Sequence, residues 1–176
     1  MYFKKLVGEK CYLSPVDVDD FQKYTEWLND LEITRNLLSS SWALNELVEK
    51  EALEKISREH SYSIVDLKSN ELIGICGLHD ISQIYRRCEL GIFIGNKAFL
   101  GLGYGEDAIR QLVKYGFEYL NMRNIMLRVF EFNERAISCY KKVGFKEIGK
   151  RRQGIELERK TFDIVFMDLL YEDLIL

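Results

Sequence analysis

A glycine-rich turn that leads directly into an amphipathic helix constrains the fold and function of this chain more than any other feature. The turn reads Leu-Gly-Leu-Gly-Tyr-Gly over residues 100–105, and the amphipathic run covers Glu106 to Leu120. The first N–H groups of a helix have no partner within the helix and lie at the positive end of its dipole. This end of the helix is therefore predicted to bind phosphate oxygens.

The residues after the turn exclude one nucleotide-binding motif and argue against another. A P-loop has Lys and then Ser or Thr after its last glycine, whereas Glu106 and Asp107 stand here. The dinucleotide-binding pattern needs a third glycine at Glu106, and it opens a long parallel sheet rather than following the midpoint of a short chain. Glycine-rich turns also precede helices that bind no ligand, and this alternative stays open for the turn taken alone.

Hydrophobic periodicity predicts an α+β fold: helices first, then an antiparallel meander, then two strand–helix units. Strands are expected over residues 10–13, 61–67, 72–78, 87–95, 125–130, 146–152 and 160–170. Helices are expected over residues 17–29, from after residue 41 to about residue 59, and over residues 106–120 and 133–143. The second helix is expected to bury Leu44, Leu47, Val48 and Ile56, and Gly144 fits the left-handed residue after the last helix.

Composition limits the class of protein. A chain of 176 residues with 47% hydrophobic and 30% charged residues is expected to form a single domain over residues 1–176. The net charge of −3 argues against a nucleic-acid partner. No apolar run is long enough for a bilayer and the N-terminus lacks a signal-peptide pattern, so a cytoplasmic protein is expected. The four scattered cysteines are interpreted as reduced thiols, and no metal is expected.

A second signature lies downstream of the turn. Residues 133–145 read Asn-Glu-Arg-Ala-Ile-Ser-Cys-Tyr-Lys-Lys-Val-Gly-Phe, and residues 88–95 form an alternating strand that ends in glycine. From about residue 86 to residue 170 the chain resembles the Gcn5-related N-acetyltransferase (GNAT) superfamily, and it is most similar to the branch of the ribosomal-protein N-terminal and spermidine-type acetyltransferases. The resemblance implies a mixed, mostly antiparallel central sheet of about six to seven strands with about four flanking helices. The chain differs from the family pattern at Leu100, where the family usually has Gln or Arg.

The resemblance implies how acetyl-coenzyme A would be bound. The main chain of Ile92, Phe93 and Ile94 would pair with the pantetheine arm as an added strand. The amides of Leu102, Gly103, Tyr104, Gly105 and Glu106 would hold the diphosphate. Asn133 would cap its helix and also hydrogen-bond the pantetheine arm, although a cap alone is the alternative.

Amine attack on a thioester needs a base for the amine, a donor for the oxyanion and an acid for the departing thiolate. Tyr140 is the candidate acid, since a phenol can protonate that thiolate; core packing beside Ile137 is the alternative. Glu89 is the candidate base, directly or through a water, but binding of a cationic acceptor or an ordinary salt bridge would also explain it. A backbone N–H near Phe93 is the expected oxyanion donor.

The expected function is acetyl transfer from acetyl-coenzyme A to a primary amine, such as a protein N-terminus or a polyamine. Acceptor recognition is assigned to residues 26–42, which carry Glu26, Asp30 and Glu32, and to the loop around residues 81–86. The alternative is a non-catalytic sensor module that binds an acyl-coenzyme A without turnover. A homodimer is common in similar proteins, and no membrane partner is expected.

Overall fold

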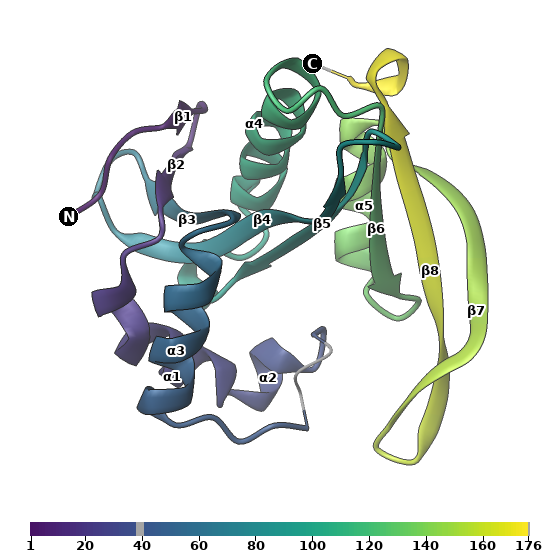
Figure 1. Cartoon of the computed structure of the whole chain (residues 1–176). Coiled ribbons are helices and arrows are strands. Elements are labelled where there is room, and N and C mark those ends of the chain that lie inside the picture. The colour runs from purple at the N-terminus through teal and green to yellow at the C-terminus, as the bar shows by residue number, and fades with distance from the viewer. Residues whose placement is uncertain (38–40, 176) are drawn as a thin grey trace. The chain divides into compact units, whose positions relative to one another are not determined.

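The computed structural model describes residues 1–37 and 41–175. Its strands follow the order β1-β2-β3-β4-β5-β6-β8-β7 in one sheet (Figure 1). They are β1 (Leu6–Val7), β2 (Cys11–Pro15), β3 (His60–Asp66), β4 (Leu72–Ser82), β5 (Arg87–Ile94), β6 (Asn124–Phe130), β7 (Lys146–Leu157) and β8 (Lys160–Leu170). The pairs β1/β2, β2/β3, β6/β8 and β7/β8 are antiparallel, whereas β5 and β6 run parallel. The predicted α+β class with a mostly antiparallel sheet is confirmed.

The helices are α1 (Phe21–Leu28), α2 (Leu31–Thr34), α3 (Glu46–Ile56), α4 (Tyr104–Glu118) and α5 (Glu134–Val143). Three 3-10 turns join them: η1 (Val18–Asp20), η2 (Lys97–Phe99) and η3 (Tyr171–Asp173). Within the described residues, β1 and α2 are additions to the predicted elements. They have two and four residues, too few to show a hydrophobic period. None of the described helices is long and apolar enough to span a bilayer.

The chain divides into two compact units. Unit 1 comprises Met1–Gly77 and Ile92–Gln111, and unit 2 comprises Leu78–Gly91 and Leu112–Leu176. Unit 1 has a hydrophobic core to which β2, α1, α3, β3 and β4 each contribute. Its buried members are Tyr12, Tyr24, Trp27, Leu53, Val65 and Leu72. The rings of Tyr24 and Trp27, both on α1, pack edge to face, 5.5 Å apart. The Tyr24 hydroxyl also hydrogen-bonds the Ser63 hydroxyl at 3.1 Å, which joins α1 to β3.

Helix α3 is rotated from the predicted orientation. Leu47 and Val48 were expected to be buried, but their side chains are 68% and 45% exposed. Asn45 caps the helix, with its side chain accepting from the N–H of Val48, and the buried face instead carries Glu49 and Leu53. The physical reason is that Leu53 joins the core of unit 1, and the position one turn before it on the same face is Glu49. The prediction was wrong because an acidic residue occupies a core-facing position.

This burial makes Glu49 a pH-dependent element of stability. Glu49 is 5% exposed, and burial raises the pKa of its carboxyl to about 7. An unfolded chain releases this proton near pH 4.3, so the folded state holds one proton more between about pH 4 and 7. The stability that this group contributes is therefore complete below about pH 4 and lost as pH rises through 7, and it amounts to about 3 kcal/mol.

We expect Glu49→Gln to remove most of this pH dependence. The free energy of unfolding of the variant should exceed that of the parent by about 2 kcal/mol at pH 8, and the two should converge toward pH 5. Urea unfolding at pH 5, 6, 7 and 8 measures the difference. Glu51→Gln, which changes an exposed residue of the same helix, should leave the pH profile unchanged. Parallel profiles for the parent and Glu49→Gln would contradict the prediction.

Unit 2 is built from the antiparallel ladder of β6, β8 and β7 with helix α5. Gly144 ends α5 with φ +117°, and Phe145 is buried beside Tyr140, with the ring centroids 5.9 Å apart; both features confirm the predicted helix end. A Cβ at Gly116 of α4 would lie 3.0 Å from side-chain atoms of Ile125 and Leu78, so α4 packs closely on the strands of this unit. Strand β7 carries two register shifts against β8.

Candidate functional site

The glycine turn in unit 1 presents a row of unpaired main-chain N–H groups. The turn lies between η2 and α4, and Gly101 and Gly103 have φ values of +75° and +86°, which side chains other than glycine rarely adopt. The first helical hydrogen bond runs from the N–H of Asp107 to the carbonyl of Gly103. Among the described residues, no acceptor pairs with the N–H groups from Gly101 to Glu106. The predicted phosphate-binding amides are therefore free to bind an anion.

Side chains of unit 1 hold this turn in place. The Tyr104 hydroxyl donates to Asp66 at 2.7 Å, and the rings of Phe99 and Tyr104 pack edge to face at 5.1 Å. The hydrogen bond to Asp66 raises the pKa of Tyr104 to about 12. The two aromatic residues at the ends of the turn are thus fixed to each other, and one of them is fixed to the β3 carboxylate. The main chain between them has a defined conformation before any ligand binds.

Asp107 connects the helix start to the β1–β2 hairpin. Its carboxylate accepts from the N–H groups of Glu9, Lys10 and Cys11 at 3.0, 2.9 and 3.0 Å. Burial acts to raise the pKa of Asp107, but the three backbone donors outweigh it and lower this pKa below its usual range. In the sequence, Asp107 serves only as evidence against a P-loop. The partners are 96 to 98 residues away, so no local pattern could have revealed this role.

The end of β5 carries the residues expected to contact the pantetheine arm. Pairing of β5 with β6 ends at Glu89 opposite Met126 in the described register, so Ile92 to Ile94 lie beyond the paired part. Their side chains are half-buried. The Phe93 ring packs edge to face on Trp27 with the centroids 6.4 Å apart. The side chain of Phe93 thus belongs to the core of unit 1.

Asn133 and Tyr140 lie on helix α5 in unit 2. The Asn133 side chain accepts from the N–H of Ala136 at 3.2 Å, which confirms its predicted role as a helix cap. Tyr140 is 8% exposed, and burial raises the pKa of its phenol. No hydrogen-bond partner of the Tyr140 hydroxyl is found among the described residues. The hydroxyl is thus not used to hold the helix in place.

Glu89 forms an ion pair. Its carboxylate accepts from Nε of Arg128 at 2.6 Å, and the two side chains are 18% and 42% exposed. Arg128 lies on β6, two residues after the register partner of Glu89. The salt-bridged alternative for Glu89 is therefore present in the structure. One carboxylate oxygen is used in the bond to Nε of Arg128, and any base role has to operate beside this guanidinium.

The acidic residues expected to recognise the acceptor are partly neutralised. Lys97 pairs with Asp30 at 2.7 Å and with Glu32 at 2.5 Å. Asp30 also caps α2, where its side chain accepts from the N–H of Glu32. Glu26 is exposed, and residues 38–40 of the expected acceptor segment lie outside the described residues. Only part of the predicted acidity thus remains available to a cationic ligand.

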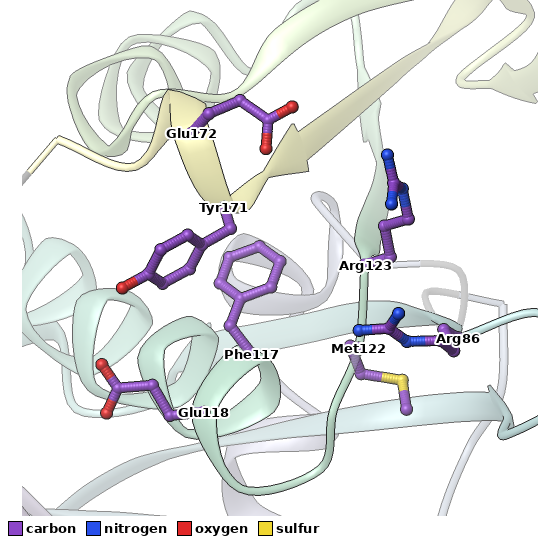
Figure 2. A pocket seen from close by; sticks show the side chains of 7 residues that line it. All are labelled: Arg86, Phe117, Glu118, Met122, Arg123, Tyr171 and Glu172. Atoms are coloured by element: carbon purple, nitrogen blue, oxygen red, sulfur yellow. The ribbon is translucent and has the colours of Figure 1, made fainter.

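A pocket in unit 2 is lined by one residue of the other expected acceptor element, Arg86, together with residues of α4, the segment after it and η3. Figure 2 shows the guanidinium groups of Arg86 and Arg123 on one side and the rings of Tyr171 and Phe117 on the other. Those rings pack edge to face at 5.7 Å. Arg86 donates to the main-chain carbonyl and to the side chain of Asn121 at 2.9 and 2.8 Å. None of the predicted catalytic or carrier-binding residues lines this pocket.

Comparisons with known proteins match these observations. A family profile described as "Acetyltransferase (GNAT) domain" matches residues 10–146. The chain is similar to the uncharacterized N-acetyltransferase p20 of Bacillus licheniformis, with 24% identity over 94% of this chain and 95% of that protein.

Two solved structures share the fold. The spermidine N-acetyltransferase of Vibrio cholerae in complex with coenzyme A and spermine has a TM-score of 0.84 and 23% identity, over 93% of this chain and 96% of that one. RimL, a ribosomal alpha-N-protein acetyltransferase in complex with coenzyme A, has a TM-score of 0.81 and 14% identity, over 93% and 96%. These likenesses extend over nearly the whole chain.

Proposed function

The chain belongs to the GNAT family of acetyltransferases, and from this premise we propose that it transfers the acetyl group of acetyl-coenzyme A to a primary amine by direct attack. The observation that carries the proposal is the set of unpaired N–H groups from Gly101 to Glu106 at the start of α4. A diphosphate offers the anionic oxygens that such a helix start binds.

Different parts of the chain would bind different parts of the carrier. The amides of residues 102–106 would hold the diphosphate. The main chain of Ile92 to Ile94, beyond the part of β5 that pairs with β6, would accept the pantetheine arm as an additional strand. The oxygen of the Asn133 side chain accepts the capping bond from Ala136, so its NH2 group would donate to the same arm.

The chemical step is a displacement at the thioester carbonyl. The neutral amine attacks this carbon and forms an N–C bond, and the negative charge of the tetrahedral intermediate develops on the carbonyl oxygen, where an N–H near Phe93 would stabilise it. The C–S bond then breaks, the thiolate leaves and takes a proton, and the amine loses one to a base. The products are the acetylated amine and free coenzyme A.

Tyr140 has the properties of the acid for this step. Burial raises the pKa of its phenol, so the hydroxyl still carries its proton at neutral pH, when the thiolate leaves and needs one. Since the hydroxyl has no partner among the described residues, its proton remains available.

Glu89 is the proposed base, through a water molecule. We expect Glu89→Gln to lower kcat/KM about 100-fold at pH 7. Because the ion pair with Arg128 is partly exposed, its loss should change the free energy of unfolding by under about 1 kcal/mol. Initial rates of thiol release between pH 6 and 9 measure the effect.

Arg128→Gln is the matched control, since it breaks the same ion pair but keeps the carboxylate. It should retain most of the activity at pH 7. Equal losses in Arg128→Gln and Glu89→Gln would show that the ion pair positions β5 and that Glu89 is not a base.

The test of the function combines binding with turnover. Calorimetric titration with acetyl-coenzyme A should show binding, and thiol release should appear with at least one amine from a panel of polyamines, amino sugars and peptides with free N-termini. The relatives named for spermidine and for a ribosomal alpha-N-protein set the first members of this panel. Binding without release from any amine would instead favour the sensor module. This module is the second candidate because Glu89 is ion-paired and because the turn begins with Leu100 and not with Gln or Arg. Absence of binding would overturn both functions.

A further inference from the structure

The glycine turn has no cationic side chain of its own. The residue before its first glycine is Leu100, and two carboxylates, Glu106 and Asp107, directly follow the last glycine. Glu106 pairs with Arg110 at 2.8 Å, and Asp107 is occupied by the hairpin N–H groups. A bound diphosphate would thus approach free amides with negative side chains close by. Charge compensation has to come from another segment of the chain.

Lys10 reaches the turn from the β1–β2 hairpin. A Cβ placed on Gly103 would lie 3.2 Å from Cε and 4.0 Å from Nζ of Lys10, and Nζ is 6.0 Å from the centroid of the Tyr104 ring. The aliphatic part of the side chain therefore lies along the turn. No carboxylate within the described part of the chain forms an ion pair with Lys10. The ammonium is exposed and available to an anionic ligand.

The main chain of Lys10 is anchored, which separates it from an ordinary surface lysine. Its N–H donates to the carboxylate of Asp107, which lies in the first turn of α4. Gly8 allows this contact, because a Cβ there would overlap the Asp107 carboxylate. The helix start thus fixes the backbone of Lys10, and the end of its side chain lies beside Gly103 in the turn. Such an arrangement reduces the entropy lost when a ligand binds.

We propose that the Lys10 ammonium binds the diphosphate of the acyl carrier and supplies the positive charge that the glycine turn lacks. The inference rests on the proposed function, because it assigns a second partner to the same phosphate oxygens. An ammonium adds a full positive charge, so its hydrogen bond to a phosphate oxygen gains a Coulombic attraction that neutral amide donors do not supply. The contact with the Tyr104 ring is at the limit of a cation–π interaction, and it leaves the three donors of the ammonium to the ligand.

The test compares ligands with and without the diphosphate. Calorimetric titration of Lys10→Met, Lys10→Arg and the parent with acetyl-coenzyme A is repeated with S-acetylpantetheine, which has no phosphate. We expect Lys10→Met to weaken acetyl-coenzyme A about 10-fold and to reduce the salt dependence of Kd, whereas Lys10→Arg stays within about 3-fold of the parent. Binding of S-acetylpantetheine should be the same in all three proteins.

Lys4→Met is the matched control. Lys4 is an exposed lysine whose ammonium also lies over a tyrosine, 5.4 Å from the Tyr12 centroid, so it tests loss of charge and of a ring contact alone. Its Kd values should equal those of the parent. Unchanged affinity in Lys10→Met, or an equal loss for both ligands or in Lys4→Met, would overturn the assignment of Lys10. A parent protein that binds neither ligand would overturn the proposed function itself.

Discussion

Replacement of Tyr140 by phenylalanine is expected to lower kcat for acetyl transfer about 100- to 1000-fold while changing Kd for acetyl-coenzyme A less than about 2-fold. The substitution removes one oxygen and keeps the ring. Because the ring packs beside Phe145 and the residue is 8% exposed, the helix should retain its position. The loss therefore falls on the step in which the thiolate takes a proton.

Rates of thiol release at saturating acetyl-coenzyme A, together with calorimetric Kd values, measure the two quantities separately. Tyr119→Phe is the control, since Tyr119 is 74% exposed and lies in the same unit; it should leave both quantities unchanged. The free energy of unfolding of Tyr140→Phe should stay within about 1 kcal/mol of the parent, because no partner of the hydroxyl is left unpaired. Equal losses of kcat and of carrier affinity would remove Tyr140 from the acid role.

The pH profile gives a further criterion for the same prediction. Burial raises the pKa of Tyr140, so the protonated, active form of this acid persists above pH 9. The parent should show no alkaline limb from the phenol between pH 7 and 9. An alkaline limb that appears in the parent and vanishes in Tyr140→Phe would place the pKa of this group far lower than its burial implies.

Local sequence signals predicted the elements that carry the candidate site. The bounds of helix α5 could be predicted from its two end residues, because Asn133 caps it and Gly144 takes the left-handed conformation after it. The turn before α4 was predicted from its glycines for the same reason. Helix α3 was misread because its orientation depends on the packing of Leu53 in the core of unit 1, and the apolar side chains of Leu47 and Val48 gave the opposite signal.

The interactions that complete the site are not local. Asp107 accepts from N–H groups some 97 residues away, and Glu89 pairs with Arg128 on another strand, 39 residues away. A main-chain donor has no side-chain signature, so no pattern in residues 8–11 indicates the contact with Asp107. The sequence contains 25 lysines and arginines, and nothing in its local pattern distinguishes Lys10 from the others. Such residues become visible only when the fold brings their partners together.

Asp107→Asn is expected to lower the free energy of unfolding by about 3 kcal/mol, which shifts Tm by roughly 9 °C for a chain of this size. The amide presents a donor where the carboxylate accepted three N–H groups, so buried main-chain donors lose their partner. Urea unfolding at pH 7 measures the loss. Glu118→Gln, an exposed change on the same helix, should cost less than about 0.5 kcal/mol.

The same carboxylate predicts how the loss depends on pH. The pKa of Asp107 is lowered in the folded state, so its contribution is present above the unfolded pKa, about 3.9, and is lost as pH falls through the folded value. The difference between parent and Asp107→Asn should therefore shrink at pH 3. A difference that stays constant from pH 7 to pH 3 would show that the stabilisation does not depend on the charge.

Asp107 also positions the main chain of Lys10, so we expect the loss of stability in Asp107→Asn to be accompanied by weaker carrier binding. If the carboxylate anchors the hairpin, Asp107→Asn should weaken acetyl-coenzyme A about as much as Lys10→Met does. The double variant should then bind little more weakly than either single variant, since removal of the ammonium costs nothing once the hairpin has moved. Additive losses in the calorimetric Kd would mean that the two residues act independently, and the anchor would be unrelated to the charge at the turn.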